Sequence, residues 1–152
     1  MSKNSDLSKI RDKIDSLDNK ILSLLNERAE LAIQAGQAKQ DSIKYKPARE
    51  SSILKRVMDL NEGPLEADQV KHVFNEIISS CRSTESTFTI SYLGPEGTFS
   101  ESALQGQFGK SVDKIPEETI RSIFESVDRG ESDFGIVPIE NSTEGSVNST
   151  LD

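Results

Sequence analysis

The sequence is poor in cysteine, histidine and aromatic residues. Its 152 residues include one cysteine, one histidine and no tryptophan, and aromatic residues make up 5%. One thiol excludes an internal disulfide, and one cysteine beside one histidine offers no set of transition-metal ligands. We therefore expect Cys81 to be a small, half-buried helix residue, and we expect neither a metal nor a cofactor.

Long apolar runs and basic clusters are also missing. The apolar runs are a few residues long, far below the roughly 20 that a membrane-spanning helix needs. The opening stretch MSKNSDLSKIRDKID is polar and contains acids, unlike a signal peptide. A net charge of −8 without a basic cluster argues against nucleic acids and anionic membranes as partners. We expect a cytoplasmic protein that acts on a small molecule.

Charge divides the chain into two parts. Residues 1–86 contain 14 basic and 14 acidic residues, whereas residues 87–152 contain 4 basic and 12 acidic residues. The composition changes at the same point, from leucine and isoleucine at helical spacing to β-branched residues and glycine. We predict two units, 1–86 and 87–152.

The first unit is predicted to be all-α. Apolar residues recur every three or four positions across residues 7–40 without a proline, which predicts a helix about 50 Å long. Proline opens the predicted second and third helices, at residues 47–60 and 64–85. Three such helices make a thin monomer, so we expect an intertwined dimer that covers the long apolar seam from both sides.

The second unit is predicted to be α/β. A strand at 87–94 is followed by a glycine turn and a helix ending near residue 108, then by a helix at 117–130 and a strand at 132–142. This order is typical of a sheet with parallel strands. About 65 residues do not complete such a domain, so we expect this unit to be truncated.

Arg28 interrupts the apolar seam of the first helix. Lys39 lies about three turns and about 16 Å further along the same face. Arg11 is about 25 Å from Arg28, and its side-chain direction is rotated by about 100° around the helix axis. One interpretation is a buried ion pair of Arg28 with Glu50 or Glu76. The other is a site for a multiply anionic ligand, completed by Arg11 of a second chain. The residues of one chain that can converge there are Arg28, Lys39, Arg49, Glu50 and Glu85.

In order and spacing, these residues resemble the helical class of chorismate mutase. The match covers about the first 85 residues and rests on Arg11, Arg28, the segment GQAK ending at Lys39 and the segment KPARE ending at Glu50. That family rearranges chorismate to prephenate within one molecule. The resemblance therefore implies a site that folds the substrate and stabilises charge on its ether oxygen, without a metal or a dedicated general base.

The resemblance also implies a role for each matching residue. Arg28 and the partner's Arg11 are expected to hold the two substrate carboxylates, and Lys39 to donate to the ether oxygen. Glu50 is expected to accept a hydrogen bond from the ring hydroxyl, and Arg49 to support the network that binds the carboxylates.

Three positions depart from the family pattern. Lys46 stands where an acidic residue can precede the Arg–Glu pair, and it can act through its backbone. Cys81 replaces a serine, which weakens one hydrogen bond. Glu85 replaces a glutamine that donates to the ether oxygen; alternatively, Glu85 is an exposed helix end and the match is shifted by one residue.

The segments YLGPEGTFSESAL and GIVPIENSTEGSV resemble the opening portion of prephenate dehydratase. Turns after strands offer backbone N–H groups to an anion, although many such turns are purely structural. The resemblance implies a bifunctional enzyme of phenylalanine synthesis. The Thr-Arg-Phe motif and the regulatory domain of that family are absent from these residues, so we expect no dehydratase activity from this chain. Residues that can line a dehydratase cleft are Thr98, Ser100, Asn141, Ser142 and Gly145.

A different class of function is a non-catalytic helical dimerisation module fused to a fragment. Such a module tolerates Arg28→Leu with a gain in stability, whereas the enzyme loses activity on the same change. A third interpretation is a binding or regulatory subunit that holds a transition-state mimic without turnover.

Glu85 gives a testable pH dependence. A carboxylate cannot donate a hydrogen bond, so we expect Glu85 to take up a proton in the substrate complex. The rate of chorismate consumption should then fall as pH rises from mildly acidic to mildly alkaline, and Glu85→Gln should flatten that profile. A flat profile in the unmodified protein that Glu85→Gln leaves unaltered contradicts this expectation.

Overall fold

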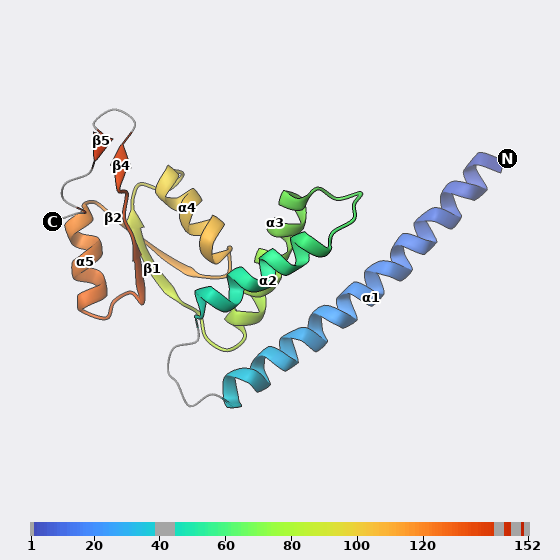
Figure 1. Cartoon of the computed structure of the whole chain (residues 1–152), viewed down its shortest axis with the longest axis horizontal. Helices are drawn as coiled ribbons and strands as arrows, with labels where there is room; N and C mark the ends of the chain where they lie inside the picture. Colours follow the sequence, from blue (N-terminus) through green and yellow to red (C-terminus); the bar gives the residue numbers. More distant parts are fainter. Residues whose placement is uncertain (1, 39–44, 142–144, 147–149, 151–152) are drawn as a thin grey trace.

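A computed structural model describes residues 2–38, 45–141, 145–146 and 150 of the chain. The elements run in the order α1 (Ser2–Ala38), α2 (Pro47–Leu60), α3 (Ala67–Ser83), β1 (Thr89–Leu93), α4 (Phe99–Phe108), β2 (Asp113–Glu117), α5 (Ile120–Asp128), β3 (Phe134–Ile136), β4 (Glu140–Asn141) and β5 (Gly145–Ser146). Figure 1 shows the helical part followed by an α/β part, which confirms the predicted fold class. Among the described residues, no helix is both long and apolar enough to cross a membrane.

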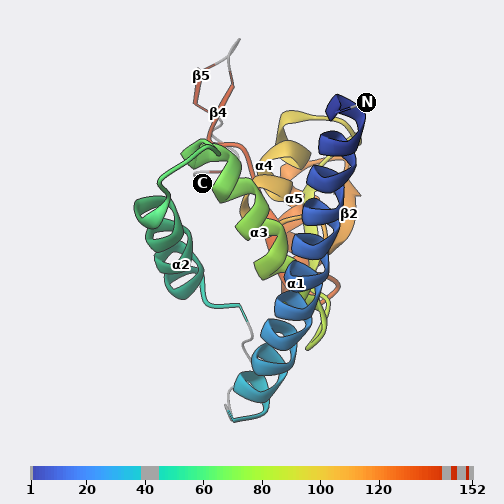
Figure 2. The same cartoon turned by 90° about the vertical axis from the view of Figure 1, so that its right-hand side faces the viewer.

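The helical part consists of two short helices and one very long one. The 37 residues of α1 confirm the predicted long helix, which begins at Ser2 rather than near Leu7. α3 packs against both α1 and α2 and lies between them (Figure 2). The N-terminal half of α1 extends beyond this bundle (Figure 1), and its apolar seam is about half exposed there. The exposed seam residues include Leu7, Ile10, Ile14, Leu17, Ile21 and Leu24.

The start of α3 differs from the prediction. Pro64 does not open the helix; it belongs to a turn, and α3 begins at Ala67. The Glu66 N–H donates to the Gln69 side chain at 2.9 Å, which satisfies one free donor of the helix start. Asn61 holds the turn by donating to the Leu65 carbonyl at 2.7 Å. Side-chain capping therefore decides this boundary, and the proline does not.

The main sheet has three parallel strands in the order β2–β1–β3. β1 lies in the middle, with Thr89 opposite Asp113 of β2 and Ile90 opposite Phe134 of β3. The predicted order of strand, helix, helix and strand was incomplete, because it missed β2. The segment DKIPE carries charges and Pro116, and an edge strand accepts proline because one row of its backbone donors is unpaired.

The core of the α/β part includes a residue from the helical part. Tyr45, which precedes α2, is 8% exposed, and its ring lies 4.9 Å from that of Phe108 and 5.8 Å from that of Phe88. These three residues belong to one buried cluster with Ile90, Tyr92, Leu104 and Val112. The two predicted units therefore share a core, which the change of composition at residue 86 does not reveal.

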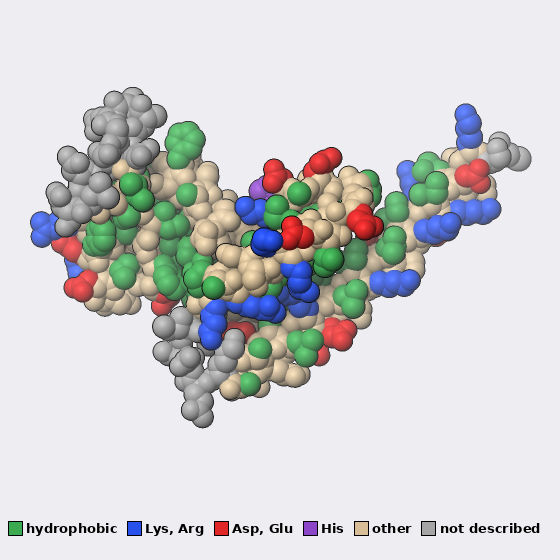
Figure 3. Space-filling view, in the orientation of Figure 1, with side chains coloured by type: hydrophobic (Ala, Val, Ile, Leu, Met, Phe, Trp, Pro, Cys, Tyr) green, Lys and Arg blue, Asp and Glu red, His purple; other side chains and the backbone are tan. Residues whose placement is uncertain are grey.

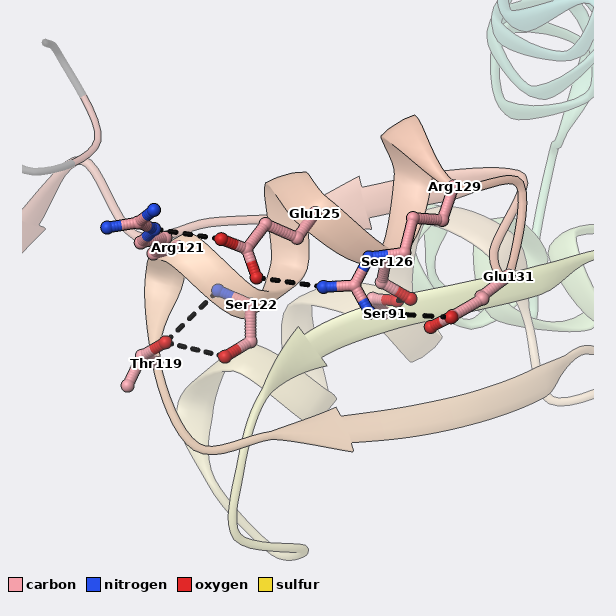
Figure 4. Close-up of polar contacts among 8 residues, drawn as sticks. All are labelled: Ser91, Thr119, Arg121, Ser122, Glu125, Ser126, Arg129 and Glu131. Atoms are coloured by element: carbon pink, nitrogen blue, oxygen red, sulfur yellow. Dashed lines mark hydrogen bonds and ion pairs between the residues drawn. The ribbon is translucent and has the colours of Figure 1, made fainter.

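Three buried serines join α5 to the central strand. Ser91 of β1 donates to Ser126 of α5 at 2.9 Å or to Ser132 at 2.7 Å, and each of the three is at most 4% exposed. Figure 4 shows Ser91 and Ser126 facing one another beneath α5. Buried hydroxyls need partners, and here they satisfy one another.

Ser91→Ala should lower the stability of the α/β part. The change removes the hydroxyl that bridges Ser126 and Ser132, so we expect a loss of about 1–2 kcal/mol in the free energy of unfolding. Urea unfolding followed by tyrosine fluorescence suits this test, because both tyrosines of the chain, Tyr45 and Tyr92, are buried in the shared core. Ser102→Ala, on the exposed face of α4, is the matched control and should leave the midpoint nearly unchanged. Equal midpoints for the two variants contradict the assigned role.

Candidate active site

A cavity of about 360 Å³ lies between the three helices of the helical part. Its wall is apolar where α1, α2 and α3 contribute Leu31, Ile53 and Ile78. Five basic and two acidic side chains also line it: Arg28, Lys46, Arg49, Arg56, Arg82, Glu50 and Glu85. Figure 3 shows basic side chains gathered where α2 faces α1. A cationic cavity in a chain of net charge −8 is suited to an anionic ligand with an apolar body.

The charged residue in the helix seam lines this cavity. Arg28 is half-buried, and among the described residues it forms no ion pair. Both carboxylates proposed as its structural partners are engaged elsewhere, since Glu50 pairs with Arg82 and Glu76 accepts from the Lys110 N–H at 3.3 Å. The structure therefore does not show the buried ion pair that was the alternative explanation for Arg28.

Glu85 also lines the cavity, two residues beyond the end of α3. Its carboxylate lies so close to Gly36 of α1 that a Cβ atom at position 36 would overlap it. Glu85 is thus a half-buried wall residue packed against α1, and the structure does not place it as an exposed helix end. Glycine at position 36 is what leaves room for the carboxylate.

The sequence predictions missed Arg82, which is 7% exposed. Its Nη1 donates to Oε1 of Glu50, and its Nη2 donates to the carbonyl of Phe108 at 2.6 Å. A signal was present in the sequence, because Arg82 follows Ile78 by four positions and so falls on the buried face of α3. It is a second arginine in an apolar stripe, like Arg28.

Of the other residues expected in the mutase site, some line the cavity and others do not. Lys46 and Arg49 line the cavity near the start of α2. Cys81 also lines it and is 5% exposed, so it is buried and not half-buried as predicted. Arg11 is exposed on the projecting half of α1 and does not reach this cavity. Lys39 lies outside the described residues.

The expected dehydratase residues fall at the carboxyl end of β1 and in the β4–β5 hairpin. The Thr98 hydroxyl, just before α4, donates to the Leu93 carbonyl at 3.2 Å, and Ser100 is half-buried in the first turn of α4. Asn141 and Gly145 are paired across the hairpin. Ser142 lies outside the described residues.

The glycine turn between β1 and α4 is held by Glu101. This carboxylate accepts from the Gly97 N–H at 2.5 Å and pairs with Lys114 of β2. The Gly97 N–H and then Lys114 lower the pKa of Glu101, and Glu101 in turn raises the pKa of Lys114. Gly97 has φ of +81°, a conformation that favours glycine. The acidic side chain thus fixes the turn to the neighbouring strand.

Among the residues whose placement is described, no group of three or more histidine, cysteine, aspartate or glutamate side chains is arranged to hold a metal ion.

These features define a class of protein, in which a three-helix bundle with a cationic cavity precedes a parallel α/β unit. A family profile described as chorismate mutase type II matches residues 10–86, and one described as prephenate dehydratase matches residues 90–152. The chain belongs to the chorismate mutase type II family, and part of a prephenate dehydratase domain follows the mutase domain.

Relatives that carry both domains match the whole chain. The bifunctional chorismate mutase/prephenate dehydratase of Stutzerimonas stutzeri is 44% identical over 159 residues, and that of Pseudomonas aeruginosa is 43% identical over the same length. The protein of the same description from Escherichia coli K12 is 30% identical over 173 residues. In all three comparisons the match covers 100% of this chain and 44% of the relative, so the chain spans less than half the length of these proteins.

Glu101 should stabilise the α/β part in a pH-dependent way. Because its pKa is lowered in the folded protein, its contribution is present above the ordinary pKa of 4.5 and is lost as pH falls through the lower folded value. We expect Glu101→Gln to lower the urea midpoint at pH 7, and the difference from the unmodified protein to shrink towards pH 3. Glu118→Gln, at an exposed position, is the control and should not change the midpoint at pH 7. A Glu101→Gln difference that stays constant across this pH range contradicts the assigned role.

Proposed function

We propose that the helical part catalyses the rearrangement of chorismate to prephenate. The observation that carries the proposal is the cavity, which combines cationic side chains from the three helices with an apolar wall. Chorismate carries two carboxylates on an apolar ring framework, so it matches both properties. Membership of the chorismate mutase type II family supports the same reaction.

The reaction needs orientation and charge stabilisation. One C–O bond breaks while one C–C bond forms within the same molecule, and no proton has to be transferred. Arg28 binds a substrate carboxylate, Arg49 supports the carboxylate network, and Glu50 accepts a hydrogen bond from the ring hydroxyl. Lys39 and protonated Glu85 donate to the ether oxygen as negative charge develops on it. The enzyme thus holds the substrate in its reactive conformation and lowers the barrier electrostatically.

We propose that the active form is a homodimer with Arg11 acting across the interface. The exposed seam of α1 supports this, because a contiguous apolar stripe marks an interaction surface. Helix geometry separates Arg11 from Arg28 by about 25 Å, too far for both to reach one small ligand in a single chain. An antiparallel partner helix would bring the partner's Arg11 to the cavity while covering the seam.

For a longer protein that includes this chain, we propose a second activity that dehydrates and decarboxylates prephenate to phenylpyruvate in phenylalanine synthesis. The match of residues 90–152 to prephenate dehydratase supports it. The turn that Glu101 holds and the β4–β5 hairpin supply part of that cleft. Thr98, Ser100, Asn141, Ser142 and Gly145 are its proposed lining in this chain.

A non-catalytic dimerisation module is an alternative, as is a binding or regulatory subunit without turnover. The exposed seam of α1 fits a module of this kind equally well. The lined cavity does not, because a pure oligomerisation helix gains nothing from placing Arg28, which has no ion pair among the described residues, beside four other basic side chains.

Mixing two inactive variants tests the proposed arrangement. Arg11→Ala and Arg28→Leu should each abolish most mutase activity, measured by loss of chorismate absorbance, because each removes a carboxylate ligand from both sites of the dimer. After denaturation and refolding together, half of the dimers are mixed, and each has one site with neither change. We expect recovery to about one quarter of the unmodified activity.

The outcomes separate the alternatives. Absence of recovery, with mixed dimers shown by mass spectrometry, contradicts the placement of Arg11 in the partner's site. An unmodified protein without mutase activity contradicts the proposed function, as does an Arg28→Leu variant that keeps full activity.

A further inference from the structure

Arg82 is a buried charge whose two terminal nitrogens both have acceptors. Nη1 donates to Oε1 of Glu50, and Nη2 donates to the Phe108 carbonyl at 2.6 Å. The guanidinium carbon also lies 5.4 Å, 5.2 Å and 6.0 Å from the ring centroids of Tyr45, Phe88 and Phe108. Such an arrangement fixes the guanidinium in position and in orientation.

The two acceptors belong to different parts of the protein. Glu50 lies on α2, lines the cavity and has a side chain that is 15% exposed. Phe108 ends α4 and belongs to the α/β core. Arg82 therefore connects a carboxylate in the mutase cavity to the backbone of the other unit.

We propose that Arg82 is a positioning residue that orients Glu50 for the mutase reaction and that its anchor is the α/β part. This inference rests on the proposed function. A glutamate side chain loses considerable rotamer entropy when it is fixed in one conformation. A charged partner that is itself held in place, as Arg82 is by the Phe108 carbonyl, stabilises that conformation. The bond to Arg82 uses Oε1, so Oε2 of Glu50 can accept the substrate hydroxyl at the same time.

Arg82 is not available as a direct carboxylate ligand. Both of its terminal nitrogens donate to protein acceptors, and its side chain is 7% exposed. Arg28 and Arg49 are more exposed and line the same cavity. Arg28 and Arg49 are therefore the arginines that interact with the negative charge of the substrate, and Arg82 acts through Glu50.

The anchor itself is held firmly against α3. In the last turn of α4, the Gly106 carbonyl accepts from Asn75 at 3.1 Å, and after the helix the Ser111 N–H donates to Ser79 at 3.3 Å. Gly109 has φ of +74° and approaches Ser79 so closely that a Cβ atom would overlap its side chain. The Phe108 carbonyl thus lies in a segment fixed on both sides, and it can hold Arg82 in one place.

A double-mutant cycle tests the proposal. Arg82→Met keeps an unbranched apolar chain among the aromatic rings but removes both hydrogen bonds, and Glu50→Gln removes the carboxylate. We expect Arg82→Met to lower kcat/KM for chorismate by about tenfold or more in the unmodified background and by less than about twofold in the Glu50→Gln background. Arg121→Met, at an exposed arginine of α5, is the matched control and should leave kcat/KM unchanged.

Folding is checked separately, by circular dichroism, tyrosine fluorescence and dimer mass. If Arg82→Met does not fold, Arg82→Lys takes its place in the cycle, because one ammonium group cannot reproduce the fork that serves two acceptors. Equal losses in both backgrounds, or no loss in a folded variant, overturn the proposal while leaving the mutase function intact. An unmodified protein without mutase activity overturns the proposed function and, with it, this inference.

Discussion

The architecture depends on α3 being covered on two sides. One side faces α1 and α2 and forms a wall of the cavity, while the other contacts the end of α4 and the segment that follows it. A helix with two buried faces has little surface left for charged residues. Arg82 is nevertheless buried there, and it is stabilised because a carboxylate, a carbonyl and three rings surround it. Where α3 sits therefore decides both the shape of the cavity and the contact between the two parts.

The contacts on both sides of α3 also bear on the proposed mutase site. The described residues that line the cavity all belong to the helical part, yet the side chain of Glu50 is held by Arg82, which also contacts the α/β part. Tyr45 makes a second contact between the two parts, since it precedes α2 but packs with Phe88 and Phe108. Each part therefore contributes contacts to the other, although the composition of the chain changes at residue 86.

Sequence patterns predicted what depends on local spacing and missed what depends on contact between distant segments. The long helix, the range of α2 and the cavity positions of Arg28, Arg49 and Glu50 followed from helical periodicity and family resemblance. The strand β2 was missed because Pro116 and its charges argue against a strand everywhere except at a sheet edge. The spacing of α3 places Arg82 on its buried face, but its acceptors are 32 and 26 residues away in sequence, and no local pattern identifies them.

The exposed seam of α1 has a consequence for how the protein reaches its native state. An isolated helix of this length, half exposed along its apolar stripe, has few tertiary contacts over its N-terminal half (Figure 1). In the proposed homodimer, a second chain would cover this seam and supply the contacts that the N-terminal half of α1 lacks within one chain. Association would then contribute directly to the stability of the mutase domain, and that stability would rise with protein concentration.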